Sequence, residues 1–216
     1  MALSANTTWE VRTDGDDANG GGFVTGAAGT DYSQQVSAQK SGTDLTMHSS
    51  TNTKCHPVGA GVSAADVGNI IQISAGTNWT VGFYEIKSQD GTDWTLDRSP
   101  AAAGEVNAAT YKMGGALRTI GKALATNAGL SALVPGNIVW VRSGTYSINT
   151  GLVVSDGTSV PINPSTHLSG YGTTRGDRGR PTIQTSSAIK MVAIGSANIH
   201  VANLILDGGD VATYGL

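Results

Sequence analysis

Short runs of aliphatic and β-branched residues recur through the second half of the chain. Loops of unequal length separate these runs, which lie at 138–141, 152–154, 167–168, 182–183, 191–194, 199–201 and 204–206. Strands this short and this frequent build either a β-sandwich or a solenoid of parallel strands. Tight Asn-Gly and Asp-Gly hairpins are scarce here, and the runs carry little charge, as expected when one side of each strand faces a continuous interior. The pattern therefore favours the solenoid.

The apolar residues of these runs are the predicted core. A solenoid strand buries its side chains against the neighbouring coil. The predicted solenoid core consists of Ile138, Val139, Val141, Val153, Leu168, Ile183, Val192, Ile194, Ile199, Val201, Leu204 and Leu206. Two interpretations stay open for Asn203, which precedes the last run: an inward turn bonded to equivalent turns in neighbouring coils, or an ordinary surface turn.

One helix is predicted, over residues 115–126. Leu117, Ile120 and Leu124 recur at i, i+3 and i+7 and form a single narrow apolar stripe. Such a stripe needs a surface to cover, and the first coil of a solenoid needs a cap over its open end. We therefore expect these three residues to be buried where the helix packs on the first coil.

A change in charge marks a predicted domain boundary near residue 112. Acidic residues predominate before it, whereas residues 113–216 contain no glutamate and carry a net positive charge. The first half reads as short strands joined by turns, and the Asp90-Gly91 turn predicts a hairpin that pairs 83–88 with 93–97. The first 30 or so residues lack periodicity, and we expect them to run extended along a partner or to stay loose until assembly.

Composition argues against several classes of protein. The net charge of −3 gives no electrostatic case for nucleic-acid binding, and the single cysteine allows no internal disulfide. No apolar run approaches the roughly 20 residues that span a bilayer, so membrane insertion is not expected. The first ten residues, MALSANTTWE, lack the basic and apolar regions of a secretory signal.

No residue set carries a convincing catalytic or metal-binding pattern, and no cofactor is expected. Glycoside hydrolysis needs two suitably spaced carboxyl groups. The second half offers only four, Asp156, Asp177, Asp207 and Asp210, of which the last two read as turn residues. The arginine-rich segment 174–180 reads as a solvated loop.

Two segments superficially suggest metal binding. Residues 14–20 resemble a calcium loop but lack its glycine and its bidentate glutamate. Cys55, His56 and His48 lack the ligand number and the spacing of a zinc site. We therefore predict no metal site, and the question of an enzyme within these 216 residues stays open, with a non-enzyme favoured.

Three phrases of the second half together resemble the opening coils of a right-handed parallel β-helix of the pectate-lyase-like fold. They are PGNIVWVRSGTY at 135–146, LSGYG at 168–172 and NIHVANLILD at 198–207. Asn137 stands where the family commonly has aspartate. The family also places an amphipathic helix over the first coil, so the resemblance implies an all-β fold, with a small β-domain at 1–112 and a capping helix plus the start of the β-helix at 113–216.

The first half is similar to a segment that precedes β-helices in phage virion proteins. The phrases are VGNIIQIS at 67–74, GFYEI at 82–86, WTLDR at 94–98 and MGGAL at 113–117. The resemblance implies a virion-attachment domain with an extended N-terminal arm, and hence a bacteriophage virion structural protein, the N-terminal part of a tail fibre or tailspike that carries a host-binding β-helix.

The implied partners are other virion proteins, namely a tail adaptor, the portal or the capsid. The resemblance also implies a homotrimer, contact with host surface polysaccharide, and a virion location after synthesis in the bacterial cytoplasm. A capsid decoration (cement) protein and a polysaccharide-degrading lyase or hydrolase remain alternatives.

Overall fold

The fold is all-β. The computed structural model describes residues 3–124, 133–155 and 165–209. In this part of the chain, far more residues lie in strands than in helices. The strands of the first half are β1 (Thr7–Val11), β2 (Gly22–Val24), β3 (Lys40–Met47), β4 (Lys54–Pro57), β5 (Ile70–Ala75), β6 (Gly82–Gln89), β7 (Trp94–Leu96) and β8 (Ala109–Met113). The later elements are α1 (Ile120–Leu124), β9 (Ile138–Arg142), β10 (Thr145–Ser147), β11 (Leu152–Val154), β12 (Thr166–Tyr171), β13 (Thr182–Gln184), β14 (Val192–Ile194), β15 (Ile199–Ala202) and β16 (Ile205–Asp207). A 3-10 turn, η1, covers Ala64–Asp66.

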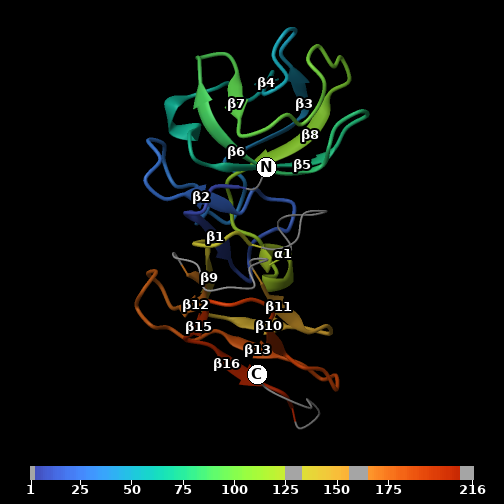
Figure 1. Cartoon of the computed structure of the whole chain (residues 1–216). Coiled ribbons are helices and arrows are strands. Elements are labelled where there is room, and N and C mark those ends of the chain that lie inside the picture. Colours follow the sequence, from blue (N-terminus) through green and yellow to red (C-terminus); the bar gives the residue numbers. More distant parts are fainter. Residues whose placement is uncertain (1–2, 125–132, 156–164, 210–216) are drawn as a thin grey trace.

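Strands β3 to β8 close into an antiparallel barrel at one end of the molecule (Figure 1). The strand order is β3-β4-β7-β6-β5-β8, and closure removes the free edges that an open sheet would expose. Alternate residues point inward, as in β8, where Ala109, Tyr111 and Met113 are buried. The predicted hairpin is confirmed as β6 pairing with β7, with a register shift between Ile86 and Ser88. Closure into a barrel was not predicted.

The N-terminal strand β1 lies inside a mixed five-stranded sheet of order β15-β12-β9-β1-β2. It pairs antiparallel with β2 and parallel with β9, and all five of its residues are buried. The expectation that the N-terminal residues lie on a partner or stay loose is therefore wrong for β1. After β2 the chain forms the barrel. The segment that leaves the barrel then lies beside the segment before β2, where Gly20 N and Gly21 N donate to the carbonyls of Gly114 and Gly115.

The strands after α1 stack in three ladders, and every pair among them is parallel. β9, β12 and β15 continue the mixed sheet, β10, β13 and β16 form a second ladder, and β11 pairs with β14 in a third. Figure 1 shows these ladders extending away from the barrel, and β1, β2 and α1 lie between the barrel and the ladders. Consecutive strands along the chain thus belong to the first, second and third ladder in turn, and the same order then repeats.

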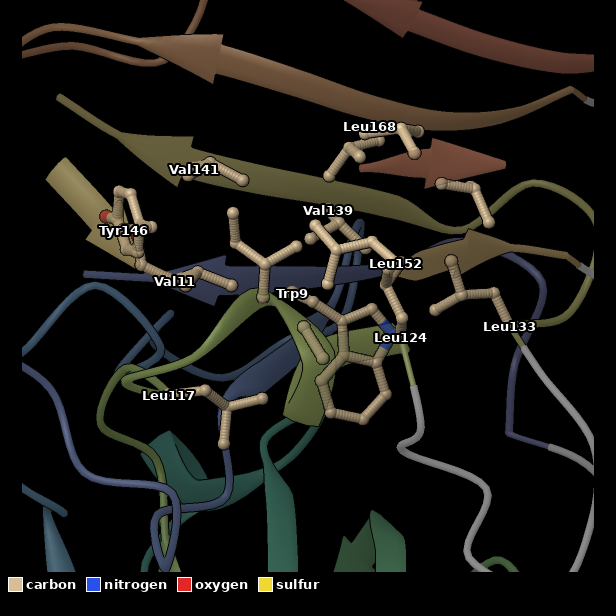
Figure 2. Packing of buried hydrophobic residues seen from close by; sticks show 14 of the residues in the cluster. Trp9, Val11, Leu117, Leu124, Leu133, Val139, Val141, Tyr146, Leu152 and Leu168 are labelled. Atoms are coloured by element: carbon tan, nitrogen blue, oxygen red, sulfur yellow. The ribbon is translucent and has the colours of Figure 1, made fainter. Parts of the chain in front are cut away.

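One hydrophobic core joins β1, α1 and the parallel strands (Figure 2). Of the predicted core residues, five are buried: Val139, Val141, Leu168, Ile183 and Val192. Four more are half-buried and pack against this core: Ile199, Val201, Leu204 and Leu206. Their partial exposure follows from their place on or between β15 and β16, the last strands of two ladders, where no further described strand covers them.

Three predicted core residues point elsewhere. Val153 is 56% exposed because its neighbours Leu152 and Val154 point inward, and successive side chains of a strand face opposite sides. Ile138 is only half-buried for the same reason, since Val139 takes the inward place. Ile194 is 55% exposed at the end of β14, the last described strand of its ladder.

The helix is shorter than predicted. It begins at Ile120 rather than at residue 115, because Gly114 and Gly115 have φ angles of 67° and 74°, outside the right-handed helical region. Leu117 is extended and forms a parallel bridge with Val11. The predicted residues 125 and 126 lie outside the described residues. Leu117, Ile120 and Leu124 are nevertheless buried, as predicted, and α1 packs on β1, β9 and β11.

We expect Leu124→Ala to lower the free energy of unfolding by about 2–5 kcal/mol, because it removes a buried side chain from the shared core. Gly121→Ala on the same helix is the matched control. Its new Cβ would meet only Leu152 Cδ2, at an ordinary 3.9 Å, so a gain of up to about 1 kcal/mol from helix propensity is expected. Urea titration of both variants measures the difference, and a loss below about 0.5 kcal/mol for Leu124→Ala would show that α1 contributes little to the core.

Asn137, which departs from the resembling family, has a specific role. Its side chain is 1% exposed, and its Nδ2 donates to the carbonyls of Ser4 (3.0 Å) and Ala5 (3.1 Å). Its Oδ1 accepts from Trp9 Nε1 at 3.3 Å. An aspartate here could not donate to the two carbonyls, so asparagine is the residue that can anchor the N-terminal segment.

We expect Asn137→Asp to destabilise the protein by at least about 1–3 kcal/mol at neutral pH, since a buried carboxylate would face two carbonyl oxygens. Asn137→Ser, which removes the side-chain amide without adding a charge, is the comparison. Thermal unfolding of both variants measures the effect, and an aspartate variant as stable as the wild type would contradict the assigned role.

Asn203 has a φ angle of 55°, and its side-chain Nδ2 lies 3.5 Å from Ser169 Oγ on β12, the strand next to β15. Asn203 is half-buried, and Ser169 is a strand residue rather than part of an equivalent turn, so this contact confirms neither interpretation of Asn203.

Candidate functional site

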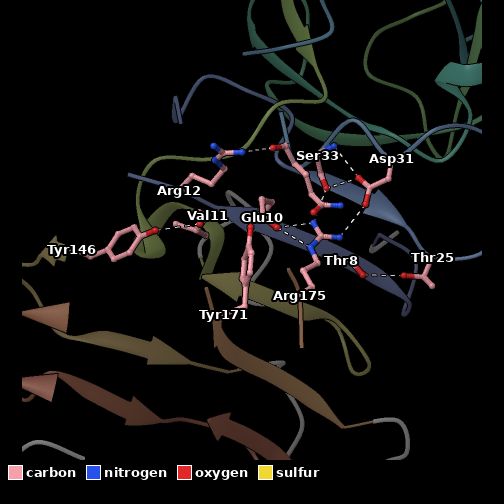
Figure 3. Close-up of polar contacts among 11 residues, drawn as sticks. Thr8, Glu10, Val11, Arg12, Thr25, Asp31, Ser33, Tyr146, Tyr171 and Arg175 are labelled. Carbon is pink, nitrogen blue, oxygen red and sulfur yellow. Dashed lines mark hydrogen bonds and ion pairs between the residues drawn. The ribbon is translucent and has the colours of Figure 1, made fainter. Parts of the chain in front are cut away.

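A cluster of buried polar side chains joins three segments that are distant in the sequence (Figure 3). Glu10 is the fourth residue of β1, and Tyr171 ends β12. Arg175 follows β12 in the next loop. Asp31 and Ser33 lie between β2 and β3. The outer face of the mixed sheet therefore carries the cluster, on the side opposite to Trp9 and Val11.

Arg175 is the centre of the cluster. Its Nε lies 2.8 Å and its Nη2 2.7 Å from Glu10 Oε2. Its Nη1 lies 3.0 Å from Asp31 Oδ2, and its Nη2 donates to Ser33 Oγ at 2.9 Å. Ser33 in turn donates to Asp31 Oδ1 at 2.5 Å. One guanidinium thus bridges two carboxylates from different segments, which suits its planar set of donors.

Burial dominates the electrostatics of Glu10. The side chain is fully buried, and burial raises its pKa above the usual value, whereas the charge of Arg175 and the Tyr171 hydrogen bond oppose the rise. Tyr171 donates its hydroxyl to Glu10 Oε1, and burial together with this bond raises the pKa of Tyr171. Tyr171 and Arg175 therefore hold the carboxylate by direct contacts.

This arrangement supports a structural role more than a catalytic one. Both oxygens of Glu10 are occupied, Oε1 by Tyr171 and Oε2 by Arg175, and no part of the residue is exposed. A general acid or base must reach the proton that it transfers. A buried, fully bonded ion pair instead fixes one relative placement of the segments that supply it. We therefore regard the cluster as a junction.

Sequence reasoning missed this cluster. Arg175 was predicted to lie in a solvated loop, which is wrong for Arg175, although Arg178 and Arg180 are exposed. Asp177 shapes that loop by accepting backbone hydrogen bonds from Gly172, Thr173, Thr174 and Gly179, which lower its pKa. The available signal was Glu10, a charged residue inside the otherwise strand-like TTWEV.

The other carboxylates considered for catalysis do not meet as a pair in the described residues. Asp177 is committed to its own loop, as above. Asp207 accepts a hydrogen bond from Gly209 N at 3.0 Å, in keeping with the predicted turn. Asp156 and Asp210 lie outside the described residues.

The acidic residues of segment 14–20 each bind a different protein group. Asp14 pairs with Arg12 at 2.9 Å, and Asp16 pairs with Lys112 at 2.5 Å. Asp17 Oδ1 accepts from the backbone N–H groups of Arg118 and Thr119, both at 2.9 Å, at the start of α1. A residue about a hundred positions away thus holds the segment that leads into α1, and Thr119 caps the helix through its Oγ1, which accepts from Lys122 N at 3.2 Å.

Both histidines of the barrel lie near Asp93, whereas Cys55 belongs to the hydrophobic core of the barrel. Cys55 is free and buried, and burial raises the pKa of its thiol. His56 Nδ1 lies 3.3 Å from Asp93 Oδ1, and His48 Nε2 lies 3.9 Å from Asp93 Oδ2. Across residues 3–124, 133–155 and 165–209, no three His, Cys, Asp or Glu side chains are grouped so that they could hold a metal ion.

No family model, curated protein or solved structure matches this chain. Within the described residues, no helix combines the length and apolar character needed to cross a membrane.

Proposed function

We propose that this chain is a bacteriophage virion structural protein, the N-terminal part of a tail fibre or tailspike. The barrel end attaches to the particle, and the parallel ladders begin a right-handed parallel β-helix that carries a host-binding surface. The proposal rests chiefly on one observation, the three parallel ladders that stack away from a closed barrel.

The order of the strands supports a coiled path. β9, β10 and β11 occupy the three ladders in turn, and β12, β13 and β14 then pair with them in the same order. β15 and β16 add the third strand to the first two ladders. Such coils bury their strands only against neighbouring coils, which makes a stiff rod. The packing of α1 on β1, β9 and β11 is consistent with a cap at the start of that rod.

The tight connection between barrel and ladders supports a mechanical role. Trp9 of β1 packs edge-on against Phe83 of the barrel, with ring centroids 5.5 Å apart. Ser4 Oγ donates to Glu85 Oε2 at 2.5 Å, and Lys112 at the end of the barrel pairs with Asp16. A protein that holds a rod on a particle must transmit force across such a joint.

The ladders end in partly uncovered strands, which supports assembly with other chains. Ile194 and Ile205 are 55% and 40% exposed on the last described strands. We propose a homotrimer whose partners are tail adaptor, portal or capsid proteins, with host surface polysaccharide as a further ligand. Sedimentation of the purified chain tests the trimer, for which three times the 22.0 kDa chain mass is expected.

Immunogold labelling of phage particles with antibody against this chain tests the location. Label confined to the tail supports the proposal, whereas label over the head would assign the chain to capsid decoration. Particles that carry no label would overturn the virion assignment. Depolymerisation of bacterial capsule or lipopolysaccharide by the purified chain would instead favour the enzyme alternative.

A further inference from the structure

The first strands of the three ladders are covered unequally. The outer edge of β9 is paired with β1, and α1 packs on β11. β10 pairs with β13 on one side, and it is the terminal strand of its ladder in the described structure. Beside β10 lies an open cleft of about 490 Å³ that is lined by β10, the residues after it, the start of α1 and Thr13.

The backbone of β10 presents unpaired groups to this cleft. Thr182 N donates to Gly144 O, and Ile148 N donates to Gln184 O, both at 2.9 Å, so residues 144, 146 and 148 direct their backbone groups toward β13. Neighbouring residues of a strand direct theirs to the opposite side. Thr145 and Ser147 therefore point their N–H and C=O groups away from β13, and in the described part of the chain no group bonds to them.

The side chains of the cleft define the chemistry of an occupant. Its floor is apolar and consists of the buried residues Ile120, Tyr146 and Leu152. Its rim carries hydroxyl and amide groups from threonine, serine and asparagine side chains. Arg118 is exposed there, and it is the one charged residue among the described residues that line the cleft.

We propose that the free edge of β10 is a docking site for an extended, acidic peptide segment of a partner polypeptide. The segment adds a strand to β10 through the backbone of Thr145 and Ser147, in the way that peptides extend exposed sheet edges. The residue opposite Tyr146 turns an apolar side chain onto the floor, because directly opposed side chains share a face. A carboxylate next to it pairs with Arg118, whose positive charge selects an acidic segment.

The free protein allows a first test by amide hydrogen exchange. The N–H groups of Thr145 and Ser147 are expected to exchange rapidly, whereas those of Tyr146 and Ile148, which face β13, are expected to be protected. Equal protection of all four would show that the edge is already covered and would overturn the proposal.

Binding is tested by NMR titration with the peptide acetyl-Thr-Val-Asp-Val-Thr-amide. Shifts are expected at Thr145, Ser147 and Arg118, and the lysine analogue of the peptide is expected to bind more weakly. Arg118→Glu should reverse this preference between the two peptides. Titration to millimolar peptide without localised shifts, or shifts indifferent to the charge reversal, would overturn the proposal.

Ser147→Pro removes one edge donor while leaving the pairing with β13 intact, since the N–H of Ser147 faces the cleft. Affinity is expected to fall about 5- to 10-fold, as for one lost hydrogen bond. If this variant does not fold, a peptide with N-methylated backbone amides tests the same bonds from the other side. Self-association of the chain that Ser147→Pro abolishes would assign the edge to a second copy and contradict the peptide partner.

Discussion

Replacing Arg175 with methionine is expected to lower the free energy of unfolding by about 3–5 kcal/mol at neutral pH, as for other buried ion pairs that lose one partner. Methionine keeps most of the side-chain length, so the variant removes charge and hydrogen bonds more than volume. The loss arises because Glu10 stays fully buried with only Tyr171 to bind it. Denaturant titration at a fixed pH measures the effect.

The destabilisation by Arg175→Met should grow as the pH rises. Burial raises the pKa of Glu10 in the folded protein, and Arg175 opposes that rise, so its removal raises this pKa further. Between the unfolded and the folded pKa the folded state binds more protons, so stability falls as the pH rises through this interval. The stability of the variant should therefore approach that of the wild type as the pH falls to 4.5, the ordinary pKa of a glutamate. The two proteins should differ most above the raised pKa of Glu10.

Arg180→Met is the matched control, because it makes the same change in the same loop at an exposed residue. Its effect is expected to stay within about 0.5 kcal/mol, as for most surface substitutions. Equal losses in the two variants, or a loss in Arg175→Met that does not depend on pH, would contradict the assigned role of the Glu10–Arg175 pair.

The sequence predicted local patterns well where burial follows the strand period. The hairpin at 83–97 and the inward places of Val139, Val141 and Leu168 are examples, because each depends on neighbouring residues alone. Val153 was placed wrongly because an unbroken apolar run does not reveal which of its alternate residues faces the core.

Features that depend on distant residues were beyond the sequence patterns. Asp17 binds the segment before α1 from about a hundred residues away, and the barrel closes through pairing between β3 and β8. Arg175 was expected to be solvated because its partners, Glu10 and Asp31, lie far away in the N-terminal part of the chain. The spacing of these residues in the sequence does not predict that the fold brings them together.

The largest such error concerned the N-terminal segment, and Trp9→Ala tests the corrected view. Trp9 is fully buried, packs against Phe83 of the barrel, and donates from Nε1 to Asn137. We expect its replacement by alanine to lower the free energy of unfolding of the isolated chain by about 3–5 kcal/mol, as for other buried aromatic residues. Because Trp9 touches both the barrel and the ladders, both should lose stability together.

Trp140→Ala is the matched control for Trp9→Ala. Trp140 lies opposite Glu10 on the neighbouring strand β9, faces the other side of the sheet, and is only half-buried. Its ring packs edge-on against Tyr171, with ring centroids 6.2 Å apart. Such an aromatic pair contributes about 0.5–1.5 kcal/mol to stability. Trp140→Ala should therefore lower the free energy of unfolding much less than Trp9→Ala. If β1 instead lay on a partner, Trp9→Ala would weaken assembly and leave the unfolding of the isolated chain unchanged.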